Sequence, residues 1–194
     1  MLDEIRKLRE QAKESGEPVL RDKSYELLIE TVKAKQPKKI LEIGVNYGLS
    51  GITMLLVSEK SQLTGIEIDE DRIKQAKENY RTFGVYERAK IFIGDASDII
   101  PTLEGMYDFI FLDGPKGHYF QYLPDLLRVL NKGGILFADN VLFRGYIFSK
   151  EKTPRRYSTT VHSMENFLTY LTTTDGLKTK VYDLEDGVSI TEKL

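Results

Sequence analysis

Apolar residues recur at helical spacing near the start of the chain, and they predict two helices before the first strand. The first helix is expected over residues 2–14 and the second over residues 24–35, with Ser24 as its N-cap and Pro37 just beyond its end. The apolar face of the first helix consists of Leu2, Ile5, Leu8 and Ala12.

From residue 38 onward, short apolar runs alternate with amphipathic segments. Strands are expected over 38–44, 62–69, 90–95, 107–113, 134–139, 179–184 and 188–193. Helices are expected over 49–60, 69–84 (with Asp69 as N-cap and Gly84 at its end), 98–103, 119–130 and 158–174. This alternation predicts an α/β fold, a seven-stranded mostly parallel sheet with helices on both faces. A hairpin at the end of the chain adds one antiparallel strand.

Length and composition favour an ordinary globular chain. The 194 residues are expected to form a single domain, with an N-terminal helical segment over 1–35 and a core over 36–194. A net charge of −2 gives no general attraction to nucleic acid, and the absence of cysteine excludes disulfides and suits a reducing cytosol. The charged N-terminus and the lack of a long apolar run predict a cytoplasmic protein without a secretory signal or a membrane span.

Polar side chains stand at nearly every predicted strand end. The polar residues are Glu42, Glu67, Asp69, Asp95, Asp113, Asp139 and Asn140, and Gly44 stands close to Glu42 at the end of the first strand. Ligands of open α/β sheets bind outside the carboxyl ends of the strands. Any one of these residues could instead cap a helix or form a turn, but their number favours a binding site.

The glycine-rich loop over residues 44–51 follows the first predicted strand and lacks the second glycine of a dinucleotide-binding motif. Glu42 lies just before it, where a carboxylate would repel a pyrophosphate but attract an ammonium or a sulfonium group. Glu67 stands where an acid can accept the hydroxyls of a ribose. The loop therefore favours S-adenosylmethionine, with a dinucleotide as the alternative.

Asp113, Asp139 and Asn140 end two strands that a strand–helix–strand connection can place side by side. Their oxygens suit Mg²⁺ or another hard divalent cation, and two carboxylates match its charge. The alternative is that Asp139 caps the loop and Asn140 forms a turn. Lys116 follows Asp113 in a tight glycine- and proline-containing loop, where it could accept a proton from a substrate hydroxyl or remain a solvated surface lysine.

Basic and aromatic residues gather in the loop over 141–157. The basic ones are Arg144, Lys150, Lys152, Arg155 and Arg156, and the aromatic ones include Tyr146, Phe148 and Tyr157. They could bind the phosphates and stack on the bases of an RNA, or they could form a solvated basic loop.

The stretches LEIGVNYGLS, GIEIDE, GDA, YDFIFLDGPKGHY and FADNV resemble the cation-dependent S-adenosylmethionine O-methyltransferases, which include catechol and caffeoyl-CoA enzymes. The resemblance covers about residues 17–194 and implies the Rossmann-like class I methyltransferase fold. It also implies roles for single residues. Asp113, Asp139 and Asn140 would bind the metal, Asp113 would also contact the cofactor, and Lys116 would be the base. The other cofactor residues would be Leu20 as a cover, Glu42, Gly44, Val45 and Ser50 at the methionine end, Glu67 at the ribose, and Asp95 and Ala96 at the adenine.

A closer resemblance, carried by KQPKKILEIG, DNVLFRG, Arg155-Arg156 and DGVSITEK, is to the bacterial tRNA 5-hydroxyuridine methyltransferases. It implies a tRNA anticodon stem-loop as partner, bound by Arg144, Arg155 and Arg156, and methylation at the wobble position. The alternative acceptor is a small catechol-like or caffeoyl-CoA-like compound, although the second catechol-gripping acid has no counterpart and the N-terminal segment is short. The resemblance also implies a homodimer, for which the first helix and the apolar patch Val141–Phe143 are candidate surfaces. A non-enzymatic nucleotide-binding module is a third hypothesis, and a dehydrogenase is the least favoured.

Overall fold

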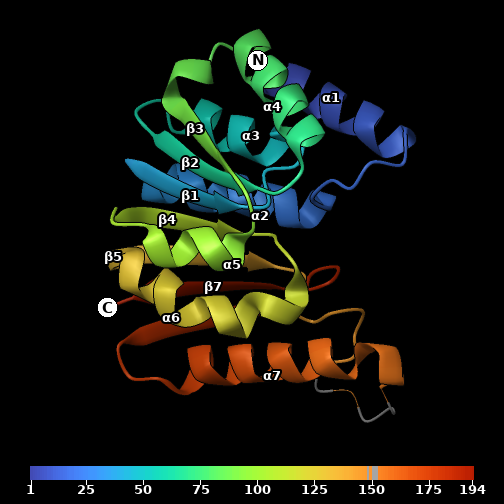
Figure 1. Ribbon diagram of the computed structural model, residues 1–194, viewed down its shortest axis with the longest axis vertical. Coiled ribbons are helices and arrows are strands. Elements are labelled where there is room, and N and C mark those ends of the chain that lie inside the picture. The colour runs from blue at the N-terminus through green and yellow to red at the C-terminus, as the bar shows by residue number, and fades with distance from the viewer. Residues whose placement is uncertain (148, 150–152) are drawn as a thin grey trace. The chain divides into compact units, whose positions relative to one another are not determined.

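The computed structural model describes residues 1–147, 149 and 153–194 (Figure 1). Phe148, Lys150 and Lys152, three of the predicted RNA-contacting residues, lie outside the described residues. The chain divides into two compact units, Met1–Ala96 and Ser97–Leu194. We describe each unit by itself, and the expectation of a single domain stays a prediction.

The first unit contains three parallel strands in the order β3-β2-β1. Its elements are α1 (Leu2–Glu14), α2 (Asp22–Lys35), β1 (Lys39–Ile43), α3 (Leu49–Val57), β2 (Gln62–Glu67), α4 (Glu70–Thr82), the single turn η1 (Tyr86–Arg88) and β3 (Ala89–Ile93). The register pairs Ile43 with Ile66 and Glu67 with Ile93, so the carboxyl ends of the three strands meet at one edge. Apolar side chains of β1, β2, α2 and α3 are buried between the helices and these strands.

The predicted cap of α2 is wrong. Arg21 occupies the N-cap position in extended conformation and the helix begins at Asp22, so Ser24 lies inside the first turns and is buried. The start of α2 is decided by the packing of its buried face, which includes Ser24, and the capping preference of serine does not decide it. By contrast, Asp69 caps α4 as predicted, because its carboxylate accepts hydrogen bonds from the backbone N–H groups of Asp71 and Arg72 at 2.9 and 3.1 Å.

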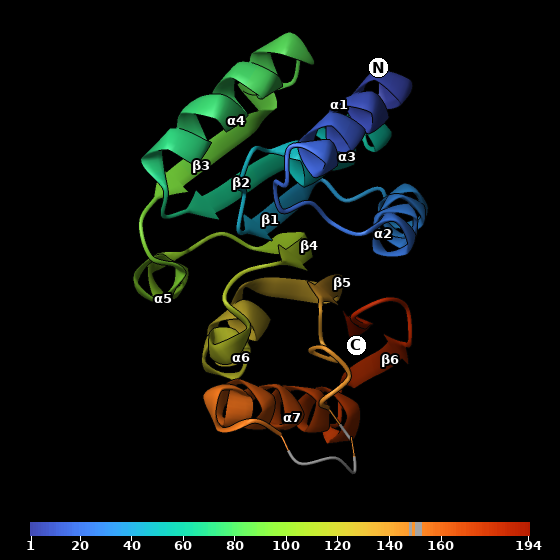
Figure 2. The same ribbon diagram turned by 90° about the vertical axis from the view of Figure 1, so that its right-hand side faces the viewer.

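The second unit contains four strands in the order β4-β5-β7-β6. Its elements are α5 (Ala96–Ile99), η2 (Ile100–Thr102), β4 (Tyr107–Leu112), η3 (Lys116–His118), α6 (Tyr119–Val129), β5 (Leu130–Asp139), η4 (Arg155–Tyr157), α7 (Ser158–Thr173), β6 (Leu177–Tyr182) and β7 (Val188–Lys193). Strand β7 runs antiparallel to both β5 and β6, which confirms the expected antiparallel strand. Helices α6 and α7 pack side by side (Figure 2).

Strand β5 begins four residues earlier than the predicted 134–139, at Leu130. Leu130 pairs with Tyr107, and the register then shifts before Phe109 pairs with Ile135. The glycine-containing stretch after Leu130 thus forms an irregularity within the strand, where the sequence pattern suggested a loop. No helix among the described residues has the length and apolar character that a membrane crossing requires.

Candidate active site

The glycine loop of the first unit joins β1 to α3 in a conformation that requires glycine at its two bends. Gly44 has φ +90° and Gly48 has φ +79°, a region that other residues rarely adopt. The N–H of Gly44 donates to the carbonyl of Ile66 at 3.0 Å, which fixes the loop beside the end of β2. At Gly48, the residue before α3, a Cβ atom would lie 2.8 Å from the ring of Tyr80, so a residue with a side chain would not fit there.

Glu42 is completely buried directly before this loop. Its carboxylate accepts a hydrogen bond from the Ser50 hydroxyl, and a Cβ atom on Gly51 would lie 2.7 Å from its second oxygen. Burial, followed by the charge of Glu42, raises the pKa of the neighbouring Tyr80 hydroxyl well above its usual value. A carboxylate held so deeply at the mouth of a loop is suited to a cationic ligand group, as the sequence pattern predicted.

Glu67 is held by three backbone amides at the end of β2. It accepts hydrogen bonds from the N–H groups of Asn46 at 2.8 Å, Ile68 at 2.9 Å and Asp69 at 3.1 Å. A carboxylate has about four acceptor positions, so these bonds orient the group and leave it capacity for a ligand hydroxyl. The N–H of Gly94 donates to the Glu67 carbonyl at 3.0 Å, which brings the following residue, Asp95, to the same edge.

The structure thus gathers the predicted cofactor residues of this unit at the carboxyl ends of its strands. They are Glu42, Gly44, Val45, Ser50, Glu67, Asp95 and Ala96. Leu20, the predicted cover, is buried, and the Asn46 amide donates to the carbonyl of Pro18 at 2.8 Å. The segment before α2 is therefore bound to the glycine loop.

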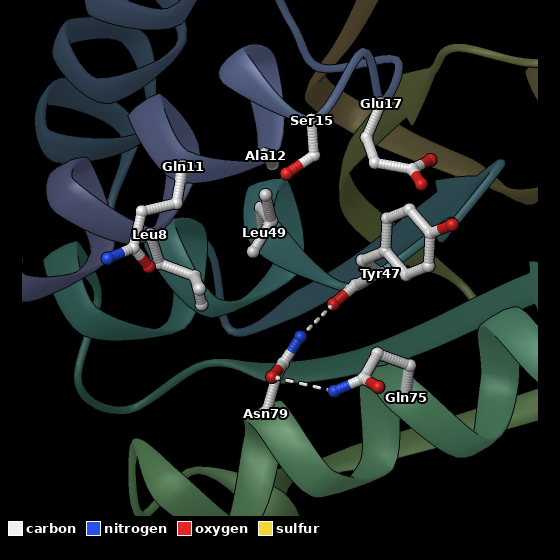
Figure 3. Close-up of a pocket in the computed structure, with 9 residues that line it drawn as sticks. All are labelled: Leu8, Gln11, Ala12, Ser15, Glu17, Tyr47, Leu49, Gln75 and Asn79. Atoms are coloured by element: carbon white, nitrogen blue, oxygen red, sulfur yellow. Dashed lines mark hydrogen bonds between the residues drawn. The ribbon is translucent and has the colours of Figure 1, made fainter.

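A pocket of about 410 Å³ opens on the α1 side of the glycine loop (Figure 3). Its lining consists of Leu8, Gln11, Ala12, Ser15, Glu17, Tyr47, Leu49, Gln75 and Asn79. The Asn79 amide donates to the Tyr47 carbonyl at 2.9 Å and so closes one side of it. Among the described residues, no strand-end acid lines this pocket. The predicted cofactor residues are therefore not part of its lining.

In the second unit, Asp113 and Asp139 follow neighbouring positions of two parallel strands. The register pairs Leu112 with Ala138, and each acid is the next residue. The buried hydroxyl of Tyr119 lies 3.0 Å from the Leu112 carbonyl and 3.2 Å from the Asp139 carbonyl, so it bridges the two strand ends. Burial and then the charges of Asp113 and Asp139 raise the pKa of Tyr119 well above its usual value. The two strand ends that carry the acids therefore meet at one phenol oxygen.

Lys116 belongs to this cluster. Its ammonium donates to Asp113 Oδ1 at 2.7 Å, and both side chains are about three-quarters buried, with 22% and 27% exposed. This contact does not fit a freely solvated surface lysine. Asn140 follows Asp139 in the left-handed region with φ +57°, a turn geometry that asparagine tolerates.

The predicted metal residues of the second unit carry the oxygen donors that a hard cation takes. Among the described residues, no group of three or more His, Cys, Asp or Glu side chains is suited to hold a metal ion. The predicted set differs from such a group, because it consists of two acids and one amide. Asp113 and Asp139 lie together, and Asn140 is adjacent in the chain, which is the oxygen chemistry that Mg²⁺ prefers.

Two of the predicted RNA-contacting arginines, Arg144 and Arg156, contact Tyr157. The guanidinium of Arg144 donates to the Tyr157 hydroxyl at 3.1 Å, and that of Arg156 lies 4.6 Å from the ring centroid. Arg155 begins the same turn, η4, and all three arginines are exposed. They form a basic cluster, which we define as Arg144, Arg155 and Arg156.

The apolar patch Val141–Phe143, which the sequence suggests for dimer contacts, mostly makes contacts within the chain. Val141 is buried and donates its N–H to the Gly187 carbonyl at 3.0 Å. Leu142 packs against Gly187, where a Cβ atom would lie 2.3 Å from Leu142 Cγ. Most of this patch therefore packs against the turn between β6 and β7 within the chain.

Two contributors were missed by the sequence pattern. Tyr119 is not among the predicted site residues, whereas its hydroxyl bridges β4 and β5. Tyr157 had been considered only for base stacking, whereas it also organises the basic cluster. Neither residue carries a sequence signal beyond its aromatic character, because their partners are distant in the sequence.

Comparison with known proteins places these sites in a family. A family model described as O-methyltransferase matches residues 1–194. Catechol O-methyltransferase from Sus scrofa is 31% identical over 173 residues, which cover 82% of this chain and 90% of that protein. Caffeoyl-CoA O-methyltransferase from Stellaria longipes is 30% identical over 129 residues, which cover 63% of this chain and 54% of that protein. The chain thus spans about half the length of some curated relatives it matches.

Solved structures agree with the predicted fold. A putative caffeoyl-CoA O-methyltransferase from Staphylococcus aureus has a TM-score of 0.88 at 26% identity, covering 97% of this chain and 91% of that one. A Podospora anserina methyltransferase, solved with S-adenosylhomocysteine bound, has a TM-score of 0.80 at 25% identity, covering 91% of this chain and 80% of that one. These similarities confirm the Rossmann-like class I methyltransferase fold, and the chain belongs to the O-methyltransferase family.

Proposed function

We propose that this chain is a magnesium-dependent S-adenosylmethionine O-methyltransferase whose acceptor is 5-hydroxyuridine at the wobble position of tRNA. The observation that carries the proposal is the cluster at the ends of β4 and β5, where the Tyr119 hydroxyl bonds the carbonyls of Leu112 and Asp139 and Lys116 is bonded to Asp113. Such a cluster combines metal ligands with a group that can exchange a proton.

The residues of the first unit would hold the cofactor. Glu42 would pair with its ammonium group, Glu67 would accept a ribose hydroxyl, and Asp95 with Ala96 would flank the adenine. When bound, S-adenosylmethionine supplies a methyl group on a sulfonium. The similar Podospora anserina structure, which contains S-adenosylhomocysteine, supports S-adenosylmethionine as the cofactor.

Exchanging Glu42 for glutamine is expected to weaken S-adenosylhomocysteine binding by about 10- to 100-fold. The reason is that a hydrogen bond between charged groups contributes about 1.5–3 kcal/mol, and the isosteric amide keeps the shape but not the charge. Isothermal titration calorimetry measures the affinity. Glu78→Gln, on the exposed face of α4, is the matched control. An unchanged affinity in Glu42→Gln would remove Glu42 from the cofactor site.

The residues of the second unit would act on the acceptor. Asp113, Asp139 and Asn140 would hold the metal, and Mg²⁺ supplies Lewis-acid stabilisation of an oxyanion when it is bound. Lys116 Nζ would first release a proton to solvent, and the neutral amine would then take the proton of the acceptor hydroxyl. The acceptor oxygen would then bond to the methyl carbon as the carbon–sulfur bond breaks, leaving a methyl ether and S-adenosylhomocysteine.

The basic cluster supports an RNA acceptor. Two exposed arginines, Arg144 and Arg156, contact Tyr157, and the exposed Arg155 lies in the same turn, η4. The whole chain carries a net charge of −2, so any attraction of phosphates by these arginines must be local. The loop that carries Lys116 packs against the start of α7, and η4 with its two arginines directly precedes that helix. A 5-hydroxyuracil ring also offers a hydroxyl beside a carbonyl, a pair of oxygens suited to one hard cation.

The alternative acceptor is a small molecule with vicinal hydroxyls. The relatives favour this alternative, because they are named catechol O-methyltransferase and caffeoyl-CoA O-methyltransferase. The two acceptors are separated by supplying labelled S-adenosylmethionine with Mg²⁺ to tRNA carrying 5-hydroxyuridine and, in parallel, to catechol. We expect label in the tRNA and its loss on addition of EDTA. Turnover of catechol with none of tRNA would overturn the acceptor, and turnover that persists in EDTA would overturn the metal.

Replacing both Arg155 and Arg156 with alanine is expected to lower kcat/KM for tRNA about tenfold or more at low salt. Each lost phosphate contact also reduces the slope of the logarithm of the binding constant against the logarithm of the salt concentration by about one. The turnover of tRNA therefore becomes less sensitive to salt. Rates over a series of salt concentrations measure both effects. The control is Lys178→Ala with Lys180→Ala, which removes the same charge from exposed positions of β6. Equal losses in both double variants would show that only net charge matters.

We also propose that the enzyme is a cytoplasmic homodimer. Val141 and, on the apolar face of α1, Ile5 are both buried within the chain, so this proposal rests on the family resemblance. Sedimentation equilibrium of the purified chain determines the oligomeric state, and a monomer at micromolar concentration would contradict the proposal.

A further inference from the structure

Residues 17–20, between α1 and α2, form contacts on two sides. On one side is the glycine loop: the Asn46 amide donates to the Pro18 carbonyl at 2.8 Å, and Glu17 and Tyr47 line the same pocket. On the other side is α1, from which Arg9 Nη2 donates to the Leu20 carbonyl at 2.5 Å. This segment, with Leu20 as the proposed cover of the cofactor, is therefore attached to both the loop and the first helix.

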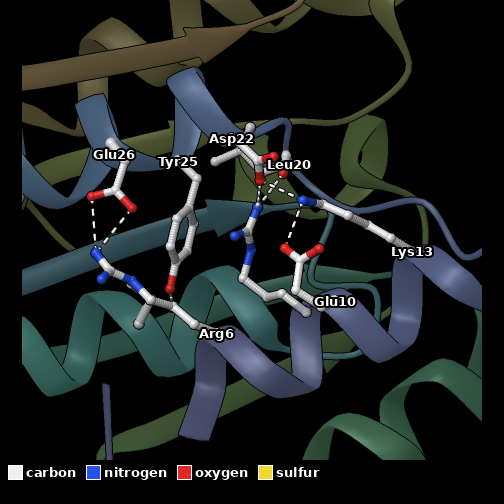
Figure 4. A network of polar contacts seen from close by, with 9 residues as sticks. Arg6, Glu10, Lys13, Leu20, Asp22, Tyr25 and Glu26 are labelled. Atoms are coloured by element: carbon white, nitrogen blue, oxygen red, sulfur yellow. Dashed lines mark hydrogen bonds and ion pairs between the residues drawn. The ribbon is translucent and has the colours of Figure 1, made fainter. Parts of the chain in front are cut away.

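Arg9 is unusual among the charged residues of α1 because only 3% of it is exposed. Its partners Leu20, Asp22 and Tyr25 are labelled in Figure 4. Its guanidinium lies 3.5 Å from the centroid of the Tyr25 ring and 3.5 Å from Asp22 Oδ1. Burial of a cation is costly unless partners compensate it, and these contacts together with the Leu20 carbonyl do so. The position of Arg9 is thus fixed by the segment and by α2 at once.

The contacts continue from Arg9 to the start of α3. The Tyr25 hydroxyl and Thr53 Oγ1 are hydrogen-bonded at 2.9 Å, and the Thr53 hydroxyl donates to the Leu49 carbonyl at 2.8 Å. Leu49 is the first residue of α3, immediately after the glycine loop. A continuous set of buried contacts therefore links α1, the segment and the element that begins at the cofactor loop.

We propose that Arg9 is a positioning residue for the cofactor: by holding the Leu20 carbonyl, it keeps residues 17–20 on the glycine loop and slows release of bound S-adenosylmethionine. The proposal rests on the cofactor site described under the proposed function. Arg9 acts through the segment and touches no reacting group. Its loss should therefore change cofactor affinity and the mobility of the segment, and leave the rate at saturating cofactor unchanged.

The test replaces Arg9 with methionine, which keeps an unbranched apolar chain and removes the guanidinium. In the cofactor-free protein, amide hydrogen exchange over residues 17–22 is expected to become at least tenfold faster. The Kd for S-adenosylhomocysteine is expected to rise about tenfold, as is KM for S-adenosylmethionine, while kcat at saturating cofactor stays within twofold. Arg9→Lys, which keeps a cation and one donor, is expected to fall between wild type and Arg9→Met in both measurements.

Arg6→Met is the matched control. Arg6 joins the same two helices through Glu26 at 2.9 Å, but this pair is about half exposed and lies away from the segment. Its loss should leave exchange over 17–22 and cofactor affinity unchanged. If Arg9→Met proves unfolded by circular dichroism, the Arg9→Lys comparison carries the test.

The outcomes separate this proposal from the proposed function. Unchanged exchange over residues 17–22 in the Arg9 variants, or faster exchange with unchanged affinity, would overturn the positioning role. A similar effect of Arg6→Met would assign the change to general helix docking and would also overturn it. Failure of the wild-type chain to bind S-adenosylhomocysteine would instead refute the cofactor site, whatever the exchange data show.

Discussion

Asp139→Asn is expected to lower the rate of methyl transfer about a thousandfold and to remove its dependence on Mg²⁺. Asp139 is only 3% exposed, so its packing depends on the shape of the side chain. Because the amide has almost the same shape as the carboxylate, the fold should be retained. The predicted ligand set loses one of its two charges, and the metal's stabilisation of a developing oxyanion contributes several kcal/mol, with each factor of ten in rate equal to about 1.4 kcal/mol. Initial rates over a range of Mg²⁺ concentrations measure the effect.

Asp108→Asn is the matched control for Asp139→Asn. Asp108 lies near the amino end of β4, where it accepts a hydrogen bond from the Asn131 amide at 2.8 Å, whereas Asp139 ends β5. The control should keep both rate and metal dependence, and S-adenosylhomocysteine should still bind Asp139→Asn. A variant at position 139 that stays fully active with Mg²⁺ would eliminate the metal site.

Lys116→Arg is expected to lower kcat by about 10²- to 10⁴-fold, the usual contribution of general acid–base catalysis. Arginine can keep the ion pair that lysine forms with Asp113 Oδ1 at 2.7 Å, but its guanidinium does not give up a proton in proteins. The variant therefore tests the base separately from the ion pair. Single-turnover rates with labelled cofactor are the measurement.

Lys116→Met removes both the base and the ion pair and should lose at least as much activity. Calorimetry should show that neither variant binds S-adenosylhomocysteine more weakly than wild type by more than about twofold. If Lys116→Arg turned over near the wild-type rate, the role of Lys116 would be reduced to pairing with Asp113.

The elements with clear boundaries were predictable from the sequence. The apolar run of β4 stops at Leu112 and the next residue is an acid, so the predicted end was correct to one residue. Asp69 capped α4 as expected, because its carboxylate and the amides it caps are neighbours in the chain. Local chemistry decides such features, and the sequence displays it directly.

Features that depend on distant residues were not predictable. Ser24 has the chemistry of a cap but is buried within α2, and Leu130 belongs to β5 because it pairs with Tyr107. The importance of Tyr119 depends on two carbonyls, one on β4 and one on β5. Arg9 follows Ile5 by one helical turn and so falls on the buried face of α1, a signal that its charge obscured.

The order of the proposed functional residues along the chain has a consequence for how such enzymes diversify. Every proposed cofactor residue except Asp113 precedes residue 97, whereas the proposed metal ligands, base and acceptor-binding arginines all follow it. Recognition of the donor and choice of acceptor are thus encoded in consecutive stretches of sequence. Mutations that retarget the enzyme to a new hydroxyl compound can accumulate in the later stretch, while the earlier one is inherited intact.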